Sequence, residues 1–448
     1  MNFFNRHIDD RDRLMNKWRR AASPELIALV RDVATQLENY EKYLGLRKRA
    51  RRTDDYEVFY GCVEALVCDL IHRALTSENM MGRIAVSMDN TVNATRYKAV
   101  TDSHQFPNIV RMMATPEMGW LEVCEIGNRY GGWQIGKRTA VRAAARLLDR
   151  IDYWGIESHH IELKGEQEIV IQKTGKHDPK NTIDGRAEWI DYPESNIAKK
   201  YRSEVREINE HLRAKTISYT GERLVDLTDT RLQRFFNNAS FKQGGRLFGG
   251  FWQNLKARQV RLVTINSEKV SEVDFECMQV ALARAEAGVT HDLSTDAYNV
   301  DVIDTKPGEE RSEWKTETTR KGIKKVFASM LFARKPFKRW PRETQTHFPP
   351  GTKLSNVTDA IERAHPDLSH LWYTGAGYRL MFTESQILVK VLLRLKEQGV
   401  IALPKHDCVV VPASRKHLAA RIMRETFREL TGGAVGVTVD GSKLTSVT

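Results

Sequence analysis

Cysteine is scarce in this chain, and close cysteine pairs are missing. The five cysteines among the 448 residues are scattered along the sequence, at Cys62, Cys68, Cys124, Cys277 and Cys408. Their odd number and wide spacing argue against a disulfide framework and against a zinc site built on paired cysteines. We therefore predict ordinary thiols that are buried or half-buried in the folded protein.

Long apolar runs are also missing from the sequence. No stretch approaches the roughly 20 apolar residues that a helix needs to cross a bilayer. The beginning of the chain, MNFFNRHIDDRDRLMNKWRR, has no long apolar segment of the kind found in a secretory signal. These absences predict a cytoplasmic protein without a membrane partner.

Positive charge is present in excess, and its distribution is more informative than its total of +12. Residues 311–340 contain ten Lys or Arg against two Glu, and a second run of cations lies at residues 47–52. Clustered cations near aromatic residues attract a phosphate backbone through counterion release. In the first segment we expect DNA contacts from Lys325, Arg334 and Lys335. The 47–52 run fits a nucleic-acid contact and a solvated basic face equally well.

The length predicts two or three domains. Apolar residues recur at three- and four-residue intervals as far as residue 75, which predicts a helical N-terminal region over residues 1–95. A later polar segment, punctuated by Pro and Gly, predicts a linker over residues 176–195. Between these regions, residues 96–175 form a separate candidate module.

Residues 96–175 resemble a winged-helix DNA-binding module in their pattern. An amphipathic helix is predicted over residues 137–156, followed by two alternating runs around the turn-prone Lys164-Gly165. On that helix a stripe of arginines would either contact DNA or only face water, with Arg138 and Arg142 as the candidate DNA contacts. The arginines repeat every four residues, at Arg138, Arg142, Arg146 and Arg150.

Two aspartates in the C-terminal half follow short apolar strands. Two strands around residues 262–275 predict a hairpin with Asn266 and Ser267 near its turn and Asp274 at the end of its second strand. Much later, His406 and Asp407 form a tight turn between two apolar strands. Two such carboxylates suit two-metal phosphoryl transfer, because Mg²⁺ relies on one or two carboxylates plus substrate phosphates. We therefore predict two Mg²⁺ ions, with Mn²⁺ as the alternative metal.

A basic helix lies between these two aspartates in the sequence. Residues 318–334 predict a helix with Arg320, Lys324 and Phe332 on one face, at four-residue spacing. Two cations one turn apart reach successive phosphates of a triphosphate, and the aromatic residue can stack on a base. Each pattern is weak alone, because a lone aspartate or an R-x-x-x-K helix is usually a solvated surface. The prediction depends on the combination of these patterns and on their order along the chain.

In that order, residues 241–445 resemble the palm and fingers of family A DNA polymerases and of the single-subunit phage and mitochondrial RNA polymerases. The resemblance implies an α+β fold, in which an antiparallel palm and helical fingers occupy residues 241–448 and a thumb-like helical segment occupies residues 196–240. It implies metal binding by Asp274, Asp407 and the carbonyl of Phe275. It also assigns nucleotide-binding or supporting roles to Arg246, Gln279, Arg320, Lys324, Phe332, Glu384 and His406.

Three positions depart from the pattern of that superfamily. Cys408 follows the His-Asp pair where the DNA enzymes usually carry Glu, Gln279 replaces the Glu that blocks a ribose hydroxyl, and Phe332 replaces a Tyr. Because Gln279 is bulky enough to hinder a ribose, the sequence favours synthesis of DNA. Residues 1–240 lack a paired D-x-E pattern with acidic partners, so no proofreading exonuclease is expected.

The resulting prediction is a template-directed DNA polymerase from a bacterial, phage or plasmid replication system. Its partners would be a DNA template-primer and nucleoside triphosphates. One alternative is a primase or RNA polymerase on the same palm. The other is a non-catalytic DNA-binding initiator on a decayed palm, for which Cys408 is the only sign.

Overall fold

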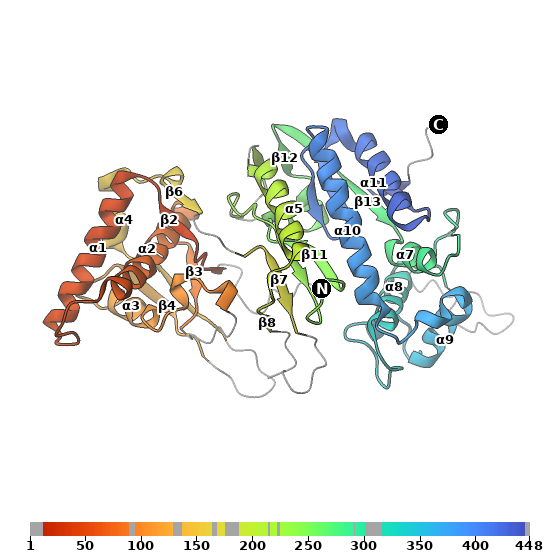
Figure 1. The fold of residues 1–448 in the computed structure, drawn as a ribbon, viewed down its shortest axis with the longest axis horizontal. Helices are drawn as coiled ribbons and strands as arrows, with labels where there is room; N and C mark the ends of the chain where they lie inside the picture. The colour runs from red at the N-terminus through yellow and green to blue at the C-terminus, as the bar shows by residue number, and fades with distance from the viewer. Residues whose placement is uncertain are drawn as a thin grey trace. The chain divides into compact units, whose positions relative to one another are not determined.

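The computed structural model describes residues 12–88, 95–128, 137–163, 168–174, 188–213, 216–221, 225–290, 292–300 and 316–443. The chain divides into two compact units, residues 1–168 and 169–448, and each has its own hydrophobic core (Figure 1). Both units combine helices with mostly antiparallel sheets, so the predicted α+β class is confirmed. No described helix combines the length and the apolar character needed to span a membrane.

Helix α2 forms the centre of the first unit. Its inner residues, from Phe59 to Ala74, are almost all buried against α1, α3, α4 and a small sheet. Ser23 caps the start of helix α1, because its side chain accepts a hydrogen bond from the Leu26 amide, and Pro24 occupies the first turn. The helices are α1 (Pro24–Tyr43), α2 (Thr53–Leu75), α3 (Phe106–Met113) and α4 (Ala145–Trp154).

Two small sheets complete the first unit. The larger has the strand order β1-β3-β5-β4, in which only the β1–β3 pair is parallel, and the smaller pairs β2 with β6. The strands are β1 (Asp12–Leu14), β2 (Arg19–Ala21), β3 (Arg83–Val86), β4 (Leu121–Glu125), β5 (Thr139–Ala143) and β6 (Ile161–Leu163).

The predicted helix and hairpin of a winged-helix module do not form. Residues 139–143 are strand β5, so the helix there is only α4, and the turn-prone Lys164-Gly165 lies outside the described residues. The runs on either side of it do not pair with each other, because β6 pairs with β2 while β7 (Val170–Lys173) belongs to the second unit. Local periodicity identified strands but could not identify their partners. The first unit therefore extends to residue 168 as a single core, with no boundary near residue 95.

The predicted arginine stripe is wrong for the same reason. Arg142 lies on β5, where its guanidinium donates to Glu122 at 2.6 Å, and Arg138 precedes that strand. Arg146 lies on α4, with its guanidinium 4.2 Å from the centre of the Trp120 ring. These arginines are divided between a strand and a helix, so they do not form a stripe along one helix. Whether Arg138 or Arg142 contacts DNA stays a prediction.

The five cysteines are free thiols, as predicted from their spacing. Four of them are buried, and only Cys124 is exposed. Cys124 lies on β4, which is the last strand of its sheet, and the middle of that strand is exposed. Cys408 is among the buried ones, and burial raises the pKa of its thiol well above the usual value.

The second unit contains two sheets. The larger is seven-stranded and has the order β14-β15-β13-β12-β9. In addition, β16 pairs with β13, along residues 273–276, and β17 pairs with β16. The smaller sheet has the order β11-β10-β7-β8. The remaining strands are β8 (Trp189–Ile190), β9 (Ile217–Tyr219), β10 (Gln233–Phe236), β11 (Gly244–Phe248), β12 (Val263–Ile265), β13 (Glu268–Glu276), β14 (Leu403–Lys405), β15 (Cys408–Pro412), β16 (Gly436–Val439) and β17 (Ser442–Lys443).

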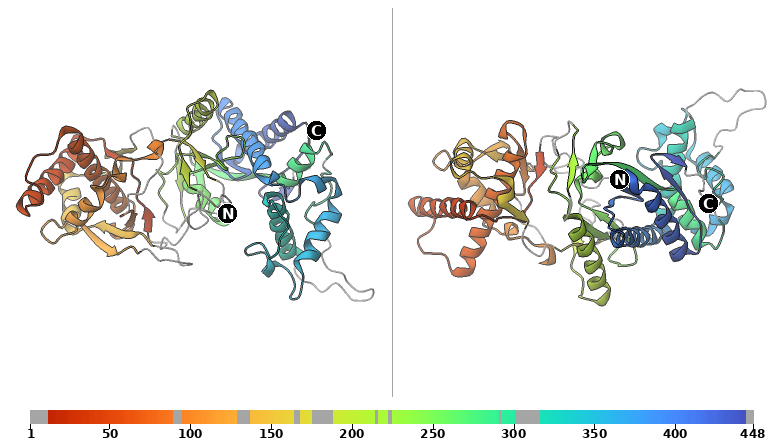
Figure 2. Two further views of the ribbon diagram at one scale, coloured as in Figure 1. Left: turned by 60° about the horizontal axis from the view of Figure 1, so that its bottom comes forward. Right: turned by 90° about the horizontal axis from the view of Figure 1, so that it is seen from above.

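Helix α10 is the longest helix described in this unit and contacts α5, α11, α7, α8 and β11. Figure 1 shows it between α5 and α11, and Figure 2 shows α8 next to α9. The helices are α5 (Asn196–Arg213), α6 (Ala257–Val260), α7 (Met278–Glu286), α8 (Thr316–Phe332), α9 (Leu354–Ala364), α10 (Ala376–Glu397) and α11 (Lys416–Thr431).

The order of elements in the C-terminal half is as predicted. The β12–β13 hairpin precedes α7, the basic helix is α8, and α10, β14, β15, α11 and β16 follow in sequence. Among the described residues of the proposed thumb-like segment 196–240, only those of α5 are helical, because β9 joins the larger sheet and β10 the smaller. Most of the predicted linker lies outside the described residues, but Trp189–Ile190 form β8, which pairs with β7.

Candidate active site

Strand β13 positions Asp274 at the centre of the larger sheet. The chain turns from β12 into β13 at Asn266 and Ser267. Both residues have a positive φ, 50° and 67°, as a two-residue hairpin turn requires. Along β13 the side chains alternate, so Val273 and Phe275 enter the core while Asp274 faces the other way. Asp274 is opposite Cys408 on β15 and opposite Thr438 on β16.

The turn between β14 and β15 brings Asp407 to the same place. Lys405 pairs with Cys408, so His406 and Asp407 are the two residues of the turn, and His406 takes a positive φ of 61°. The amide of Phe275 lies 3.5 Å from the carbonyl oxygen of Asp407. The predicted convergence of Asp274 and Asp407, 133 positions apart in the sequence, is therefore found at one end of β13.

The carboxyl group of Asp274 is electrostatically unusual. Burial first, and then the charge of Asp407, raise its pKa to about 7, while Lys324 opposes the shift. Its Oδ1 atom is buried and has no hydrogen-bond partner among the described residues. Because a buried polar atom without a partner is destabilising, this oxygen is suited to a ligand that the folded chain does not itself provide.

The donor set fits a hard divalent cation that is shared with a substrate. The described residues contain no group of three or more His, Cys, Asp or Glu side chains that could enclose a metal. Mg²⁺ is usually held by one or two carboxylates together with waters and substrate phosphates. Asp274 and Asp407, with the unpartnered Oδ1 atom of Asp274, match that requirement, whereas a closed structural metal site would need more ligands.

Helix α8 contributes the two predicted cations. Arg320 forms an ion pair with Asp296, with its Nη2 atom 3.0 Å from Asp296 Oδ1, and the exposed Lys324 lies one turn further along the helix. The Arg320 guanidinium is 5.6 Å from the centre of the Tyr298 ring, and the Lys324 ammonium is 5.9 Å from it. The electrostatic effect of Lys324 on Asp274 links this helix to the aspartates.

Asp296 and Tyr298 were not identified from the sequence. Tyr298 is fully buried, and burial raises the pKa of its hydroxyl well above the usual value. Ala297, between them, is fixed by His365, whose Nε2 atom is 2.9 Å from the Ala297 carbonyl oxygen. The only sequence signal was an acidic residue in the polar run after α7, and polar runs of this kind are common in loops.

A second polar cluster joins three residues that were predicted separately. Arg246 makes two hydrogen bonds to Glu384, from Nε to Oε1 at 2.6 Å and from Nη2 to Oε2 at 2.9 Å. Gln279 donates to Glu384 Oε2 at 2.7 Å, and its own carbonyl oxygen is buried without a partner in the described structure. Although burial opposes the shift, the charge and hydrogen bond of Glu384 raise the pKa of Arg246, and Asp407 adds to this, so the cluster lies near the aspartates.

Glu384 lies inside a helix and not at its start. Helix α10 begins at Ala376, and Glu384 lies two turns inside it with 2% of its surface exposed. The helix starts earlier because Gly375, with a positive φ of 76°, precedes it and the following residues pack against α8. Glu384 is thus a buried partner of Arg246.

The glycines before Arg246 set its position on β11. Gly245 has a positive φ of 87°, and a Cβ atom there would lie 2.6 Å from the hydroxyl of Ser385. Its carbonyl oxygen accepts a hydrogen bond from the fully buried Arg234 at 3.0 Å. His406 also lies near this strand, and burial, followed by the charge of Arg246, lowers its pKa to about 4. The His406 ring is therefore neutral at physiological pH.

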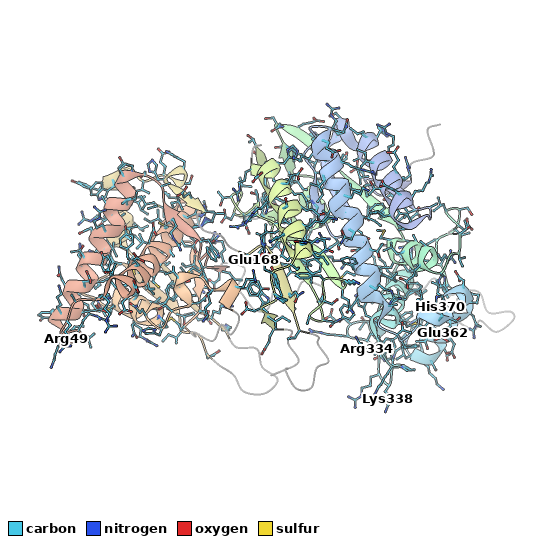
Figure 3. All side chains as sticks on the ribbon, viewed as in Figure 1. Arg49, Glu168, Arg334, Lys338, Glu362 and His370 are labelled. Carbon is cyan, nitrogen blue, oxygen red and sulfur yellow. The ribbon has the colours of Figure 1, made fainter. Side chains whose placement is uncertain are left out.

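The other predicted residues on α8 and beyond it have different surroundings. The half-buried Phe332 packs edge-on against Tyr378, with ring centres 5.0 Å apart. Lys325 is exposed, with its Nζ atom 2.9 Å from His347 Nε2. Arg334 and Lys335 are exposed in the segment after α8, where Figure 3 also shows Arg334 and Lys338. These positions are compatible with contact to a ligand, and their roles stay predictions.

Comparison with known proteins finds distant similarity among solved structures. No protein-family model matches the chain, and no curated protein matches it. Among solved structures, the chain is similar to the POL domain of Pol1 from M. smegmatis in complex with DNA primer-template and dNTP, with 11% sequence identity and a TM-score of 0.29. The match covers 54% of this chain and 51% of that one, so it spans about half of each. A similarity of this size assigns neither a ligand nor an activity to the chain.

Proposed function

We propose that the chain is a template-directed nucleic-acid polymerase, with DNA-directed DNA synthesis as its reaction and the second unit as its palm and fingers. One observation carries the proposal. Asp274 and Asp407 converge at the end of β13, where one carboxylate oxygen is buried without a partner, within electrostatic reach of the cation Lys324 on α8. Carboxylates beside a cationic helix are suited to phosphoryl transfer, which depends on positioning and charge neutralisation.

In this proposal Asp274 and Asp407, with the carbonyl of Phe275, hold the Mg²⁺ ions. Bound Mg²⁺ would activate the 3′-hydroxyl of the growing strand and neutralise charge on the phosphates. The raised pKa of Asp274, about 7 before a cation binds, means that this carboxyl must lose its proton as the metal arrives. Asp407 contributes the second negative charge at the same end of β13.

The cations of α8 bind the triphosphate. Lys324 is exposed and faces the Tyr298 ring, so its ammonium group is available to a phosphate. Arg320 is paired with Asp296, and it would exchange that carboxylate for a phosphate or extend the pair to include one. Phe332, at the end of the same helix, would lie against the base.

The cluster of Arg246, Glu384 and Gln279 is proposed to face the sugar. Gln279 is the second residue of α7, close behind Asp274, and is bulky enough to hinder a ribose 2′-hydroxyl, which favours deoxynucleotides. One observation favours the primase or RNA polymerase alternative: Glu384 holds the Gln279 amide at 2.7 Å and can draw it away from the sugar. If the chain were a non-catalytic initiator, the unpartnered oxygen of Asp274 would have no function.

Primer extension tests the proposal directly. The purified chain is incubated with a template, Mg²⁺ and either dNTPs or rNTPs, with and without a primer, and the products are separated by length. Extension of a primer with dNTPs supports a DNA polymerase, whereas products from rNTPs without a primer identify a primase or RNA polymerase. The absence of any extension, together with normal DNA binding, would leave the initiator.

A substitution at Gln279 tests the sugar assignment. Gln279→Gly removes the side chain and should lower the preference for dNTPs over rNTPs, whereas Gln398→Gly, at an exposed glutamine that caps the end of α10 in the same unit, should leave it unchanged. The ratio of kcat/KM for the two sugars is the measurement. An unchanged ratio in Gln279→Gly would show that this residue does not recognise the sugar. The metal-site assignment would not be affected.

A further inference from the structure

The turn between α1 and α2 in the first unit, residues 42–52, is unusually basic. It contains six Lys or Arg and no acidic residue. The function proposed for the second unit does not use it. Some of its cations are paired with acidic residues and others are exposed. This difference indicates the function of the turn. The six cations are Lys42, Arg47, Lys48, Arg49, Arg51 and Arg52.

Two of these cations fix the turn to the helices. The side chain of Arg51, only 3% exposed, forms ion pairs with Glu38 at 3.1 Å and with Glu41 at 2.6 Å. Its guanidinium lies 3.7 Å from the centre of the Phe59 ring on α2. Arg47 makes a further contact to Glu41, at 3.5 Å. Arg51 is therefore part of the core contact between α1 and α2, and not part of a solvated face.

The backbone of the turn is also fixed. At the end of α1, the amides of Gly45 and Leu46 donate to the carbonyl oxygens of Lys42 and Glu41, both at 3.0 Å. Gly45 takes a positive φ of 69°, as is usual for a glycine that ends a helix. The turn thus has a defined shape before any partner binds, which reduces the entropy lost on binding.

On this fixed turn the remaining side chains face outward. Tyr43 is 84% exposed, and Leu44 and Leu46 are also exposed. Within the described ranges no side-chain hydrogen bond or ion pair involves the exposed cations, and Figure 3 shows Arg49 projecting from the end of the unit. These cations are Lys42, Lys48, Arg49 and Arg52.

We propose that the α1–α2 turn binds a single-stranded segment of nucleic acid, with Lys48, Arg49 and Arg52 on phosphates and Tyr43 stacked on a base. An exposed aromatic ring among cations is the arrangement that tracks a nucleic-acid strand, since every base can stack and every phosphate is anionic. A single strand is favoured over a duplex because its bases are free to stack. The proposal is independent of polymerase activity in the second unit.

An anionic membrane is the competing partner, and the surroundings of the turn argue against it. A helix that binds a membrane presents a continuous apolar face. The exposed residues of α1 that lead to the turn, Arg31, Thr35 and Asn39, are polar. The exposed apolar side chains therefore form a local platform and not the end of a membrane-binding helix.

Fluorescence anisotropy with labelled oligothymidylate and the full-length chain, without Mg²⁺ or nucleotides, tests the proposal. Tyr43→Ala should weaken binding by about 5-fold or more, which is the lower range for loss of one stacked base. The double change Lys48→Ala/Arg49→Ala should reduce the slope of log K against log salt by about 1.4, or about 0.7 for each phosphate contact. Tyr153→Ala is the matched control, because Tyr153 is 76% exposed on α4 of the same unit.

Two further measurements decide between the remaining outcomes. Photocross-linking with an oligonucleotide that contains 5-iododeoxyuridine should attach to the peptide that contains residues 42–52. Binding to phosphatidylserine vesicles that is lost in the same variants, with unchanged oligonucleotide binding, would overturn the proposal in favour of a membrane. Variants that bind oligonucleotide like Tyr153→Ala, without cross-linking at the turn, would also overturn it. If the chain binds the oligonucleotide through the turn but extends no primer, only the polymerase assignment is refuted.

Discussion

Two aspartates, one in each unit, are enclosed in different ways. Asp69, on α2 of the first unit, is completely buried, and its carboxylate accepts hydrogen bonds from Arg13 at 2.6 Å, Arg19 at 2.8 Å and the Asn16 amide at 3.0 Å. Asp274, on β13 of the second unit, has an oxygen without a partner and a raised pKa. The partners of Asp69 come from the residues before α1, so it joins the start of the described chain to the core.

The difference is between a carboxylate that the chain itself satisfies and one that it leaves unsatisfied. Satisfying the hydrogen bonds of a buried carboxylate stabilises a fold, and removing one partner leaves an uncompensated charge. A buried carboxylate that remains unsatisfied destabilises the fold, and it persists where a ligand offsets that effect. Substitutions of Asp69 and Asp274 should therefore have opposite consequences for stability and activity.

The largest expected effect is the loss of nucleotide incorporation in Asp274→Asn and in Asp407→Asn. If the two aspartates bind metal as proposed, each change removes a metal-binding charge but retains the shape, so kcat should fall by about 1,000-fold or more, since a metal ion supplies several kcal/mol of charge stabilisation. Single-turnover extension measures the loss, and DNA binding should stay nearly intact. Asp440→Asn, an aspartate after β16, is the control. Retained extension in either active-site variant would refute the metal assignment.

Asp69→Ala should have the opposite profile. It leaves Arg19, which is 2% exposed, without its carboxylate, so the first unit should lose about 3–5 kcal/mol of stability, the usual effect of breaking a buried ion pair. Denaturant unfolding measures this change, with Asp149→Ala on α4 as a control in the same unit. Extension by molecules that remain folded should be retained. If Asp69→Ala were as stable as the control, the comparison of the two aspartates would fail.

The pKa of Asp274 predicts a coupling between pH, Mg²⁺ and stability. Its folded-state pKa, about 7, is above the ordinary value of 3.8, so between these pH values the folded chain binds a proton that the unfolded chain releases. Without metal, stability should therefore decrease as pH rises from about 4 to about 7. Mg²⁺ binds the ionised carboxylate, so its stabilising effect should increase as pH rises through about 7.

Thermal unfolding at several pH values, with and without Mg²⁺, measures this coupling. The rise in Tm on adding Mg²⁺ should be larger at pH 8 than at pH 6, by about 2 °C for each kcal/mol of stabilisation in a unit of this size. In Asp274→Asn the dependence on Mg²⁺ should disappear at both pH values. An equal Mg²⁺ effect at both pH values in the unsubstituted chain would contradict a raised pKa at this site.

Sequence analysis succeeded where a pattern depends on local chemistry. The β12–β13 hairpin, the basic helix and the His-Asp turn each follow from short-range preferences, and their order placed Asp274 and Asp407 together. It failed where strands pair at a distance, because β6 and β7 are close in the sequence but join different units. It also missed Asp296, because no local signal distinguishes the acid that pairs with Arg320 from other loop acids.

Glu384 is intermediate between Asp69 and Asp274. It is buried in the candidate site, like Asp274, but its carboxylate is fully paired, like that of Asp69. Glu384→Gln retains its shape and removes the charge that orients Arg246, which has a 25% exposed side chain and can partly recover water contacts. We expect kcat/KM to fall by about tenfold, or about 1.4 kcal/mol, mostly through KM, because the residue positions others. Glu429→Gln removes a more exposed partner of Lys390 and Arg394 on α10, and it is the matched control. A loss as large as that of Asp274→Asn would place Glu384 among the groups that contact the reacting atoms.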